Sequence, residues 1–129
     1  MDRALVSSRG VVYEEIEDEQ WIDVYCSKNY EVSDYGRIRH KITKQLLKGT
    51  PTSDGYSRVM MDYVRYLVHR VVLQSWQPID NCERFTVDHI NGIRNDNRLS
   101  NLRWSSMEDN IYYMAEHRSE LNSELSRLI

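Results

Sequence analysis

The sequence lacks any long apolar run, since no stretch approaches the roughly 20 residues that a membrane-spanning helix needs. The first ten residues, MDRALVSSRG, also lack the extended apolar segment of a secretory signal peptide. There is no internal repeat or low-complexity segment in the 129 residues, a length that fits one compact domain or two small modules sharing a core. We therefore expect a cytoplasmic protein with no membrane partner.

Cysteine is scarce, because Cys26 and Cys82 are the two thiols of the chain and no CxxC pair occurs. Two thiols 56 positions apart make no zinc site on their own, and they fit a reducing compartment better than a disulfide. We therefore expect packing, rather than disulfides or structural zinc, to hold the fold together.

Net positive charge is absent as well, because the formal net charge is −3. The charges are unevenly distributed, with 8 basic and 3 acidic side chains in residues 34–75 between two acidic ends. Local sign matters more than the total for phosphate binding, since salt screens charges beyond about 10 Å. The basic middle part is compatible with a nucleic-acid partner, and the acidic last third with a divalent cation.

The first 20 residues, which include the acidic run YEEIEDEQ, are interpreted as a solvated and partly frayed lead-in. After them, YEVS and GRIRHK have β-strand character, and SDYG between them has turn chemistry. Alternation in the second strand puts Arg37, Arg39 and Lys41 on one face, and Ile38 and His40 on the other. This cationic face fits a strand that contacts DNA in the major groove. A solvated edge strand, protected by its charges against aggregation, is the alternative.

The middle of the chain predicts a hairpin and a helix. We expect a loop at residues 49–55, a strand at 56–61, a turn at 62–63 and a brief strand at 64–66. LVHRVVLQSW then has helical periodicity, and a weak module boundary is expected near Leu67. His69 lies near the start of this helix, where packing or capping and a phosphate contact are both open interpretations.

The last third predicts a strand FTVDH, a polar loop INGIRNDNR, a second strand LSNLRW and a helix. Ser105 and Glu108 have the S-x-x-E spacing of a capping box, so we expect the helix from about residue 106 to at least 116. Leu102 and Trp104 are expected in the core.

Asp88 and His89 end the first of these strands, and Asn110 lies in the first or second turn of the expected helix. A helix packed across the two strands can bring Asn110 over the strand end. A carboxylate and an amide oxygen are hard ligands that suit Mg²⁺, and two protein ligands leave positions open for water and a phosphate. A neighbouring imidazole can act as a general base. The combination fits hydrolysis of a phosphodiester.

The spacing of this segment is distinctive, because VDH is followed by a glycine, DNR, NLRW and a final asparagine. The pattern resembles that of the HNH endonucleases of the phage and intron homing type, which have a ββα-metal fold. The upstream VHRVVLQSW is similar to the segment that precedes the motif in this family. The matching residues are Val87, Asp88, His89, Gly92, Asp96, Asn97, Arg98, Asn101, Leu102, Arg103, Trp104 and Asn110.

Further upstream, the chain resembles the small β-rich DNA-binding module that is often fused to these nucleases. The resemblance covers about residues 21–110, and the two modules occur in the usual order. The residues that match this module are Trp21, Tyr30, Val32, Ser33, Gly36, Arg37, Ile38, Arg39, Gly55 and Tyr56.

The resemblance implies an α+β protein with three parts. A small antiparallel β-rich DNA-binding module with its lead-in would occupy residues 1–66. An HNH ββα-metal nuclease module would occupy residues 67–116, and a C-terminal helical tail residues 117–129.

The resemblance also implies roles for single residues. Asp88 and Asn110 would bind the metal, with Asn110 standing where many relatives use histidine. His89 would be the general base, and Asn101 would bridge the loop so that His89 is held in place. The remaining loop amides, Asn91, Asn95 and Asn97, would satisfy backbone groups.

We expect double-stranded DNA as the substrate and Mg²⁺ as the cofactor, with Mn²⁺ as a substitute, in the cytoplasm of a bacterial host or a phage-infected cell. The family precedent implies products with a 5′-phosphate and a 3′-hydroxyl. The candidate DNA-contacting residues are Arg37, Arg39, Lys41, Arg58, Arg94, Arg98 and Arg103.

The chain departs from some relatives in two ways. It has no cysteine pairs for a structural zinc, and no helix-turn-helix module follows its nuclease motif. Instead the chain ends on MAEHRSELNSELSRLI, an amphipathic helix that either packs on its own domain or forms a homodimer. A monomer with one site would nick, whereas a dimer would cut both strands. A DNA-binding regulator or decoy without cleavage, and a nonspecific nuclease of phage DNA metabolism, remain alternatives.

Overall fold

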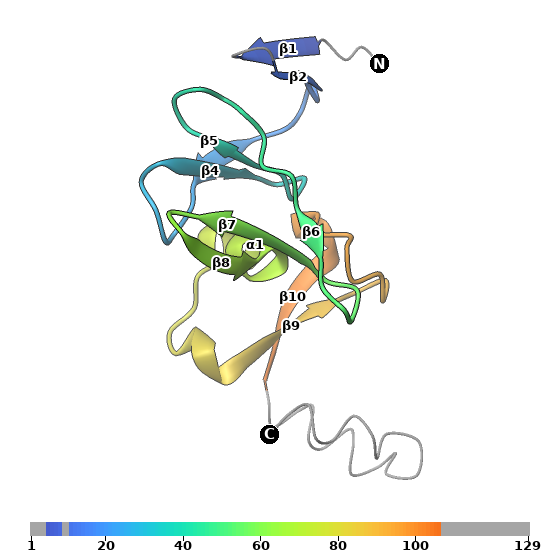
Figure 1. Ribbon diagram of the computed structural model, residues 1–129. Helices are drawn as coiled ribbons and strands as arrows, with labels where there is room; N and C mark the ends of the chain where they lie inside the picture. The colour runs from blue at the N-terminus through green and yellow to red at the C-terminus, as the bar shows by residue number, and fades with distance from the viewer. Residues whose placement is uncertain (1–4, 9–10, 107–129) are drawn as a thin grey trace.

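The computed structural model describes residues 5–8 and 11–106. Within these residues the chain forms antiparallel sheets around one α-helix (Figure 1). A hairpin of β1 (Leu5–Ser8) and β2 (Val11–Glu14) comes first, so the acidic lead-in contains regular structure that the sequence interpretation did not expect. This mixed architecture confirms the expected α+β class, whereas the expected C-terminal helix lies outside the described residues.

The second sheet consists of β3 (Trp21–Asp23), β4 (Tyr30–Ser33) and β5 (Ile38–His40). Its inner face is apolar, with Val32 fully buried and Ile38 nearly so. The turn between β4 and β5 falls on SDYG, as expected, and Gly36 there has a φ of +85°, which favours glycine.

The third sheet has β7 (Ser57–Met61) at its centre, between β6 (Thr50–Pro51) and β8 (Val64–Leu67). The β7–β8 hairpin is confirmed. Its two turn residues, Asp62 and Tyr63, both have positive φ, which matches the twist of a tight hairpin turn. The expected loop at residues 49–55 is partly wrong, because Thr50 and Pro51 pair with β7 as a short edge strand.

The helix α1 (Val68–Trp76) follows β8 directly and lies behind the β7–β8 hairpin in Figure 1. No side chain caps its N-terminus, so packing of its apolar stripe must stabilise it. Val71, Val72 and Leu73 are fully buried. The helix contacts β3 and β4 as well as β9 (Phe85–His89) and β10 (Leu102–Ser106), so both halves of the chain share one core.

Strands β9 and β10 form an antiparallel pair that begins where His89 faces Leu102. A polar loop and a 3₁₀ turn at Leu99–Asn101 connect them. Leu102 is buried and Trp104 packs against the core, as expected. Ser105 and Ser106 pair with Thr86 and Phe85 and extend β10, so the expected helix from about residue 106 does not begin within the described residues. The rest of the expected helix, including Glu108 and Asn110, lies outside the described residues.

Cys26 and Cys82 are free thiols, which confirms the expectation that they form no disulfide. Among the described helices none combines the length and apolarity that a bilayer span requires.

Candidate active site

His89 is the last residue of β9 and is buried, with 8% of its surface exposed. Its Nε2 lies 2.9 Å from the side-chain carbonyl oxygen of Asn97, in the loop that follows. An amide carbonyl oxygen only accepts hydrogen bonds, so Nε2 must carry the ring proton. The neutral ring then keeps its lone pair on Nδ1, the atom that can accept a proton.

Asn101 ties the two ends of the same loop together. Its side-chain NH₂ group donates to the Asn91 side-chain oxygen and to the Asp96 backbone oxygen, each at 2.9 Å. Its side-chain oxygen accepts a hydrogen bond from the Asn91 backbone N–H at 2.9 Å. Its backbone oxygen accepts one from the Ile90 backbone N–H at 2.8 Å. Asn101 is buried, so these bonds are shielded from water. The loop therefore has a fixed shape at the point where β9 ends.

Two aromatic rings pack beside His89. The His69 ring meets it edge to face, with 5.2 Å between centroids, and Tyr56 lies 5.0 Å from His69 and 5.8 Å from His89. His69 is buried and its Nδ1 has no hydrogen-bond partner, a geometry that favours the packing interpretation over a phosphate contact. Burial, together with the nearby His89 and Arg70, lowers the pKa of His69 to about 4. At neutral pH His69 is therefore an uncharged wall of the site.

Asp88 precedes His89 and faces outward, with 43% of its side chain exposed. Its partner across the strand pair is Arg103, whose guanidinium lies 2.8 Å from the carboxylate. The described residues contain no group of three or more acidic, histidine or cysteine side chains that could hold a metal by itself. An exposed carboxylate nevertheless offers the hard oxygen ligands that Mg²⁺ prefers. Asn110, the other expected ligand, lies outside the described residues.

The expected cationic face of β5 is present, but acidic side chains cover much of its charge. Arg37 pairs with Glu19 and Arg39 pairs with Glu31, while Lys41 pairs with Asp23 at 2.7 Å. Arg39 also stacks on the ring of Trp21, and Arg37 lies near the same ring. Any DNA contact by these three residues must therefore compete with ion pairs, a cost that the alternation pattern did not reveal.

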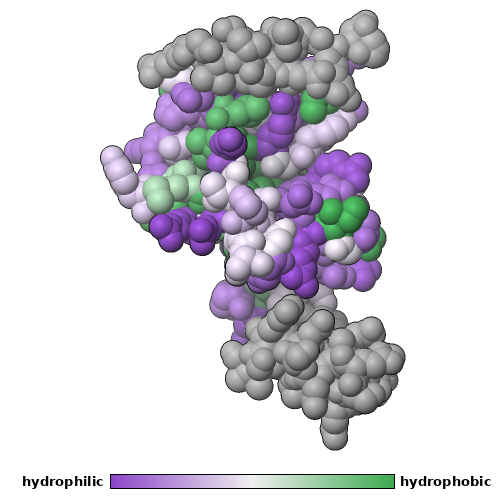
Figure 2. All heavy atoms as spheres, turned by 45° about the vertical axis from the view of Figure 1, so that its right-hand side comes forward, coloured by the Kyte–Doolittle hydropathy of each residue, from purple (hydrophilic) through white to green (hydrophobic). Residues whose placement is uncertain are grey.

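Of the other basic candidates, Arg94 and Arg98 belong to the loop after β9. Arg94 donates to the Asp54 backbone oxygen at 2.6 Å and lies over the Tyr56 ring, and Arg58 is part of β7. Arg98 binds Asp96 through two nitrogens, and this guanidinium holds the pKa of the Asp96 carboxyl well below its usual range. The surface on this side is largely hydrophilic, with a few apolar patches (Figure 2).

Of the expected site residues, His89 and Asn101 border the same loop, whereas Asp88 faces outward at the end of β9 and pairs with Arg103. Sequence reasoning gave Asn97 only a general role in the loop, although its side chain is the direct partner of His89. The signal was weak, because several asparagines occur in this loop and the spacing does not show which one bonds to the ring. Tyr56 and His69 were also not connected with the site, since 20 or more positions separate each of them from His89.

Comparisons with known proteins match two segments of the chain to described families and its fold to a solved structure. Residues 19–62 match the NUMOD4 motif, and residues 66–112 match a family described as HNH endonuclease. No curated protein matches the chain. The fold is similar to that in the solved structure described as DNA binding and cleavage by the HNH homing endonuclease I-HmuI, with a TM-score of 0.66 and 23% sequence identity.

That similarity covers 84% of this chain and 65% of the other chain, so this chain spans about two thirds of the length of that relative. At this identity the likeness concerns the fold, and the family matches carry the assignment. The two matched segments follow one another in the order that the sequence resemblance predicted. Residues 66–112 are therefore similar to HNH endonucleases, and a segment similar to the NUMOD4 motif precedes them in the chain.

Proposed function

We propose that this protein is a metal-dependent endonuclease that hydrolyses one phosphodiester of double-stranded DNA, with His89 as the general base. The observation that carries the proposal is the bond from His89 Nε2 to Asn97, which leaves Nδ1 as the proton acceptor. The buried loop around Asn101 and the neutral ring of His69 hold this imidazole in an enclosed position. A base held in a fixed orientation is what activation of a water molecule requires.

In the proposed reaction His89 Nδ1 takes a proton from water, and the resulting hydroxide attacks the phosphorus. The bond from phosphorus to the 3′ oxygen breaks, and the departing 3′ oxygen takes a proton from solvent water, which leaves a 5′-phosphate and a 3′-hydroxyl. Asn97 keeps the ring oriented while His89 becomes positively charged, because its carbonyl oxygen also stabilises the Nε2 proton of the imidazolium.

Asp88 would hold a divalent cation, with Mg²⁺ proposed as the usual ion and Mn²⁺ as its substitute. Asn110 is proposed as the second ligand from outside the described residues. A bound cation supplies stabilisation of the charge on the phosphate and on the departing oxygen. Arg103 is bonded to this carboxylate, so a bound cation would have to share or replace that ion pair.

Plasmid nicking tests the proposal directly. The full chain should convert supercoiled plasmid to open circles with Mg²⁺ but not with EDTA. His89→Ala should lose about 100-fold or more in rate, within the range of a general base. His40→Ala is the matched control, because it removes a histidine of β5 in the NUMOD4 segment. Equal nicking by His89→Ala and the wild type would overturn the assignment of the base.

The same assay separates the remaining alternatives. A DNA-binding regulator without cleavage would shift duplex DNA on a gel yet leave the plasmid intact under all metal conditions. Linear product formed at a rate that rises with protein concentration would indicate the proposed homodimer through the C-terminal segment, whereas open circles alone indicate a nicking monomer. A map of cuts on a long duplex distinguishes a homing enzyme from a nonspecific phage nuclease.

A further inference from the structure

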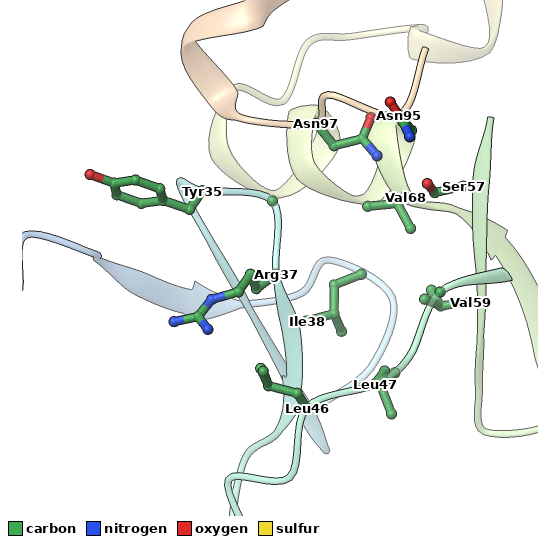
Figure 3. Close-up of a pocket in the computed structure, with 12 residues that line it drawn as sticks. Tyr35, Arg37, Ile38, Leu46, Leu47, Ser57, Val59, Val68, Asn95 and Asn97 are labelled. Carbon is green, nitrogen blue, oxygen red and sulfur yellow. The ribbon is translucent and has the colours of Figure 1, made fainter. Parts of the chain in front are cut away.

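The turn between β4 and β5 belongs to the NUMOD4 segment, yet it packs against the loop that positions His89. The Leu99 backbone N–H donates to the Asp34 backbone oxygen at 2.9 Å. Gly36 lies so close to Asn97 that a Cβ atom on Gly36 would stand 2.5 Å from the Asn97 backbone oxygen. Figure 3 shows Asn97 and Asn95 across from the turn that carries Tyr35, at the edge of a cavity of about 220 Å³.

The shape of this turn is set by its own residues. Ser33 is fully buried, and its Oγ accepts the backbone N–H groups of Tyr35 and Arg37, each at 3.1 Å. The Gly36 N–H donates to the Ser33 backbone oxygen at 3.1 Å, and φ at Gly36 is +85°. A turn fixed in this way is a rigid surface against which the other loop can rest.

We propose that Gly36 is a positioning residue for the general base, acting through Asn97. The turn fixes where the Asn97 backbone lies, and the Asn97 side chain then fixes the Nε2 proton and the orientation of the His89 ring. The NUMOD4 segment is therefore part of the scaffold of the active site, in addition to any contact that it makes with DNA. The catalytic consequence of this inference rests on the proposed function.

Gly36→Ala tests the coupling, and Gly55→Ala is its matched control. Both glycines have positive φ, +85° and +94°, so both substitutions strain the backbone in the same way. At Gly55 the added Cβ would meet only the Arg94 Cδ, at an ordinary 3.7 Å. We expect Gly36→Ala to lower kcat for nicking by about 100-fold, because small misplacements of a catalytic group cost that much. KM should stay within about twofold, and Gly55→Ala should keep the wild-type kcat.

The His89 tautomer gives a readout that does not need cleavage. In metal-free ¹⁵N-labelled protein, at a pH where the ring is neutral, the imidazole nitrogen shifts should show protonated Nε2 and unprotonated Nδ1. Gly36→Ala should give a mixture of tautomers, whereas Gly55→Ala should match the wild type. A wild-type tautomer and kcat in folded Gly36→Ala would overturn the proposal.

Ser33→Ala is a second variant that loosens the turn without adding bulk. If Gly36→Ala does not fold, Ser33→Ala decides the matter: a tautomer mixture with a reduced kcat supports the coupling, and wild-type values refute it. Should the wild type fail to nick at all, the proposed function fails, while the tautomer comparison still tests the link from the turn to His89.

Discussion

Replacing Asn101 by alanine should destabilise the loop after β9 more than any other single amide removal in it. The substitution deletes three side-chain hydrogen bonds, two donated to Asn91 and Asp96 and one accepted from the Asn91 backbone. Asn101 is 6% exposed, so water cannot readily replace these bonds. The Asp96 carbonyl and the Asn91 N–H would then lose partners inside the folded protein.

The magnitude follows from those three bonds. Each contributes a net 0.5–1.5 kcal/mol, so the free energy of unfolding should fall by about 3 kcal/mol. The free energy of unfolding of a native protein is about 5–15 kcal/mol, so this loss would be a large share of the stability. Asn101→Asp should cost at least as much, because its charged oxygens would face the carbonyl oxygens of Asn91 and Asp96 in place of a donor.

Urea unfolding followed by tryptophan fluorescence measures this change, with the midpoint and slope fitted for each variant. Asn95→Ala is the matched control, since Asn95 lies in the same loop with an exposed side chain. The control should stay within about 0.5 kcal/mol of the wild type. If Asn101→Ala is as stable as Asn95→Ala, or if Asn101→Asp is as stable as the wild type, Asn101 is not the bridge described above.

Two further predictions concern pH and salt. Burial lowers the pKa of His69 to about 4. Between about pH 6.5 and 4 the unfolded chain therefore binds a proton that the folded chain does not. As the pH falls through that range, the free energy of unfolding should decrease by about 3 kcal/mol. His69→Phe should flatten that part of the stability curve measured by urea unfolding at several pH values, and an unchanged slope would contradict the burial effect. If Lys41 contacts a DNA phosphate despite its bond to Asp23, Lys41→Ala should lower the salt slope of duplex binding by about one. A titration from low to high salt measures it, with Asp23→Ala expected to keep the wild-type slope, and an unchanged slope for Lys41→Ala would remove Lys41 from the interface.

The sequence by itself determined the elements whose signals are local. The strands β4 and β5, the hairpin β7–β8 and the helix α1 follow from alternation, turn residues and helical periodicity within short windows. The position of Asp88 and His89 at the end of a strand was also predictable, because the polar loop after them must leave the sheet. The strand β10 extends through Ser106, so the capping pattern at Ser105 did not show where this strand ends.

Only the tertiary structure decided which groups meet. Spacing placed several asparagines near His89, but the choice of Asn97 as its partner depends on how the loop folds against the β4–β5 turn, whose Gly36 is 61 positions earlier in the chain. The ion pairs that cover Arg37, Arg39 and Lys41 likewise join residues from different strands and from the lead-in. A sequence pattern constrains neighbours along the chain, whereas hydrogen bonds and ion pairs depend on distances in space, which packing of the whole core sets.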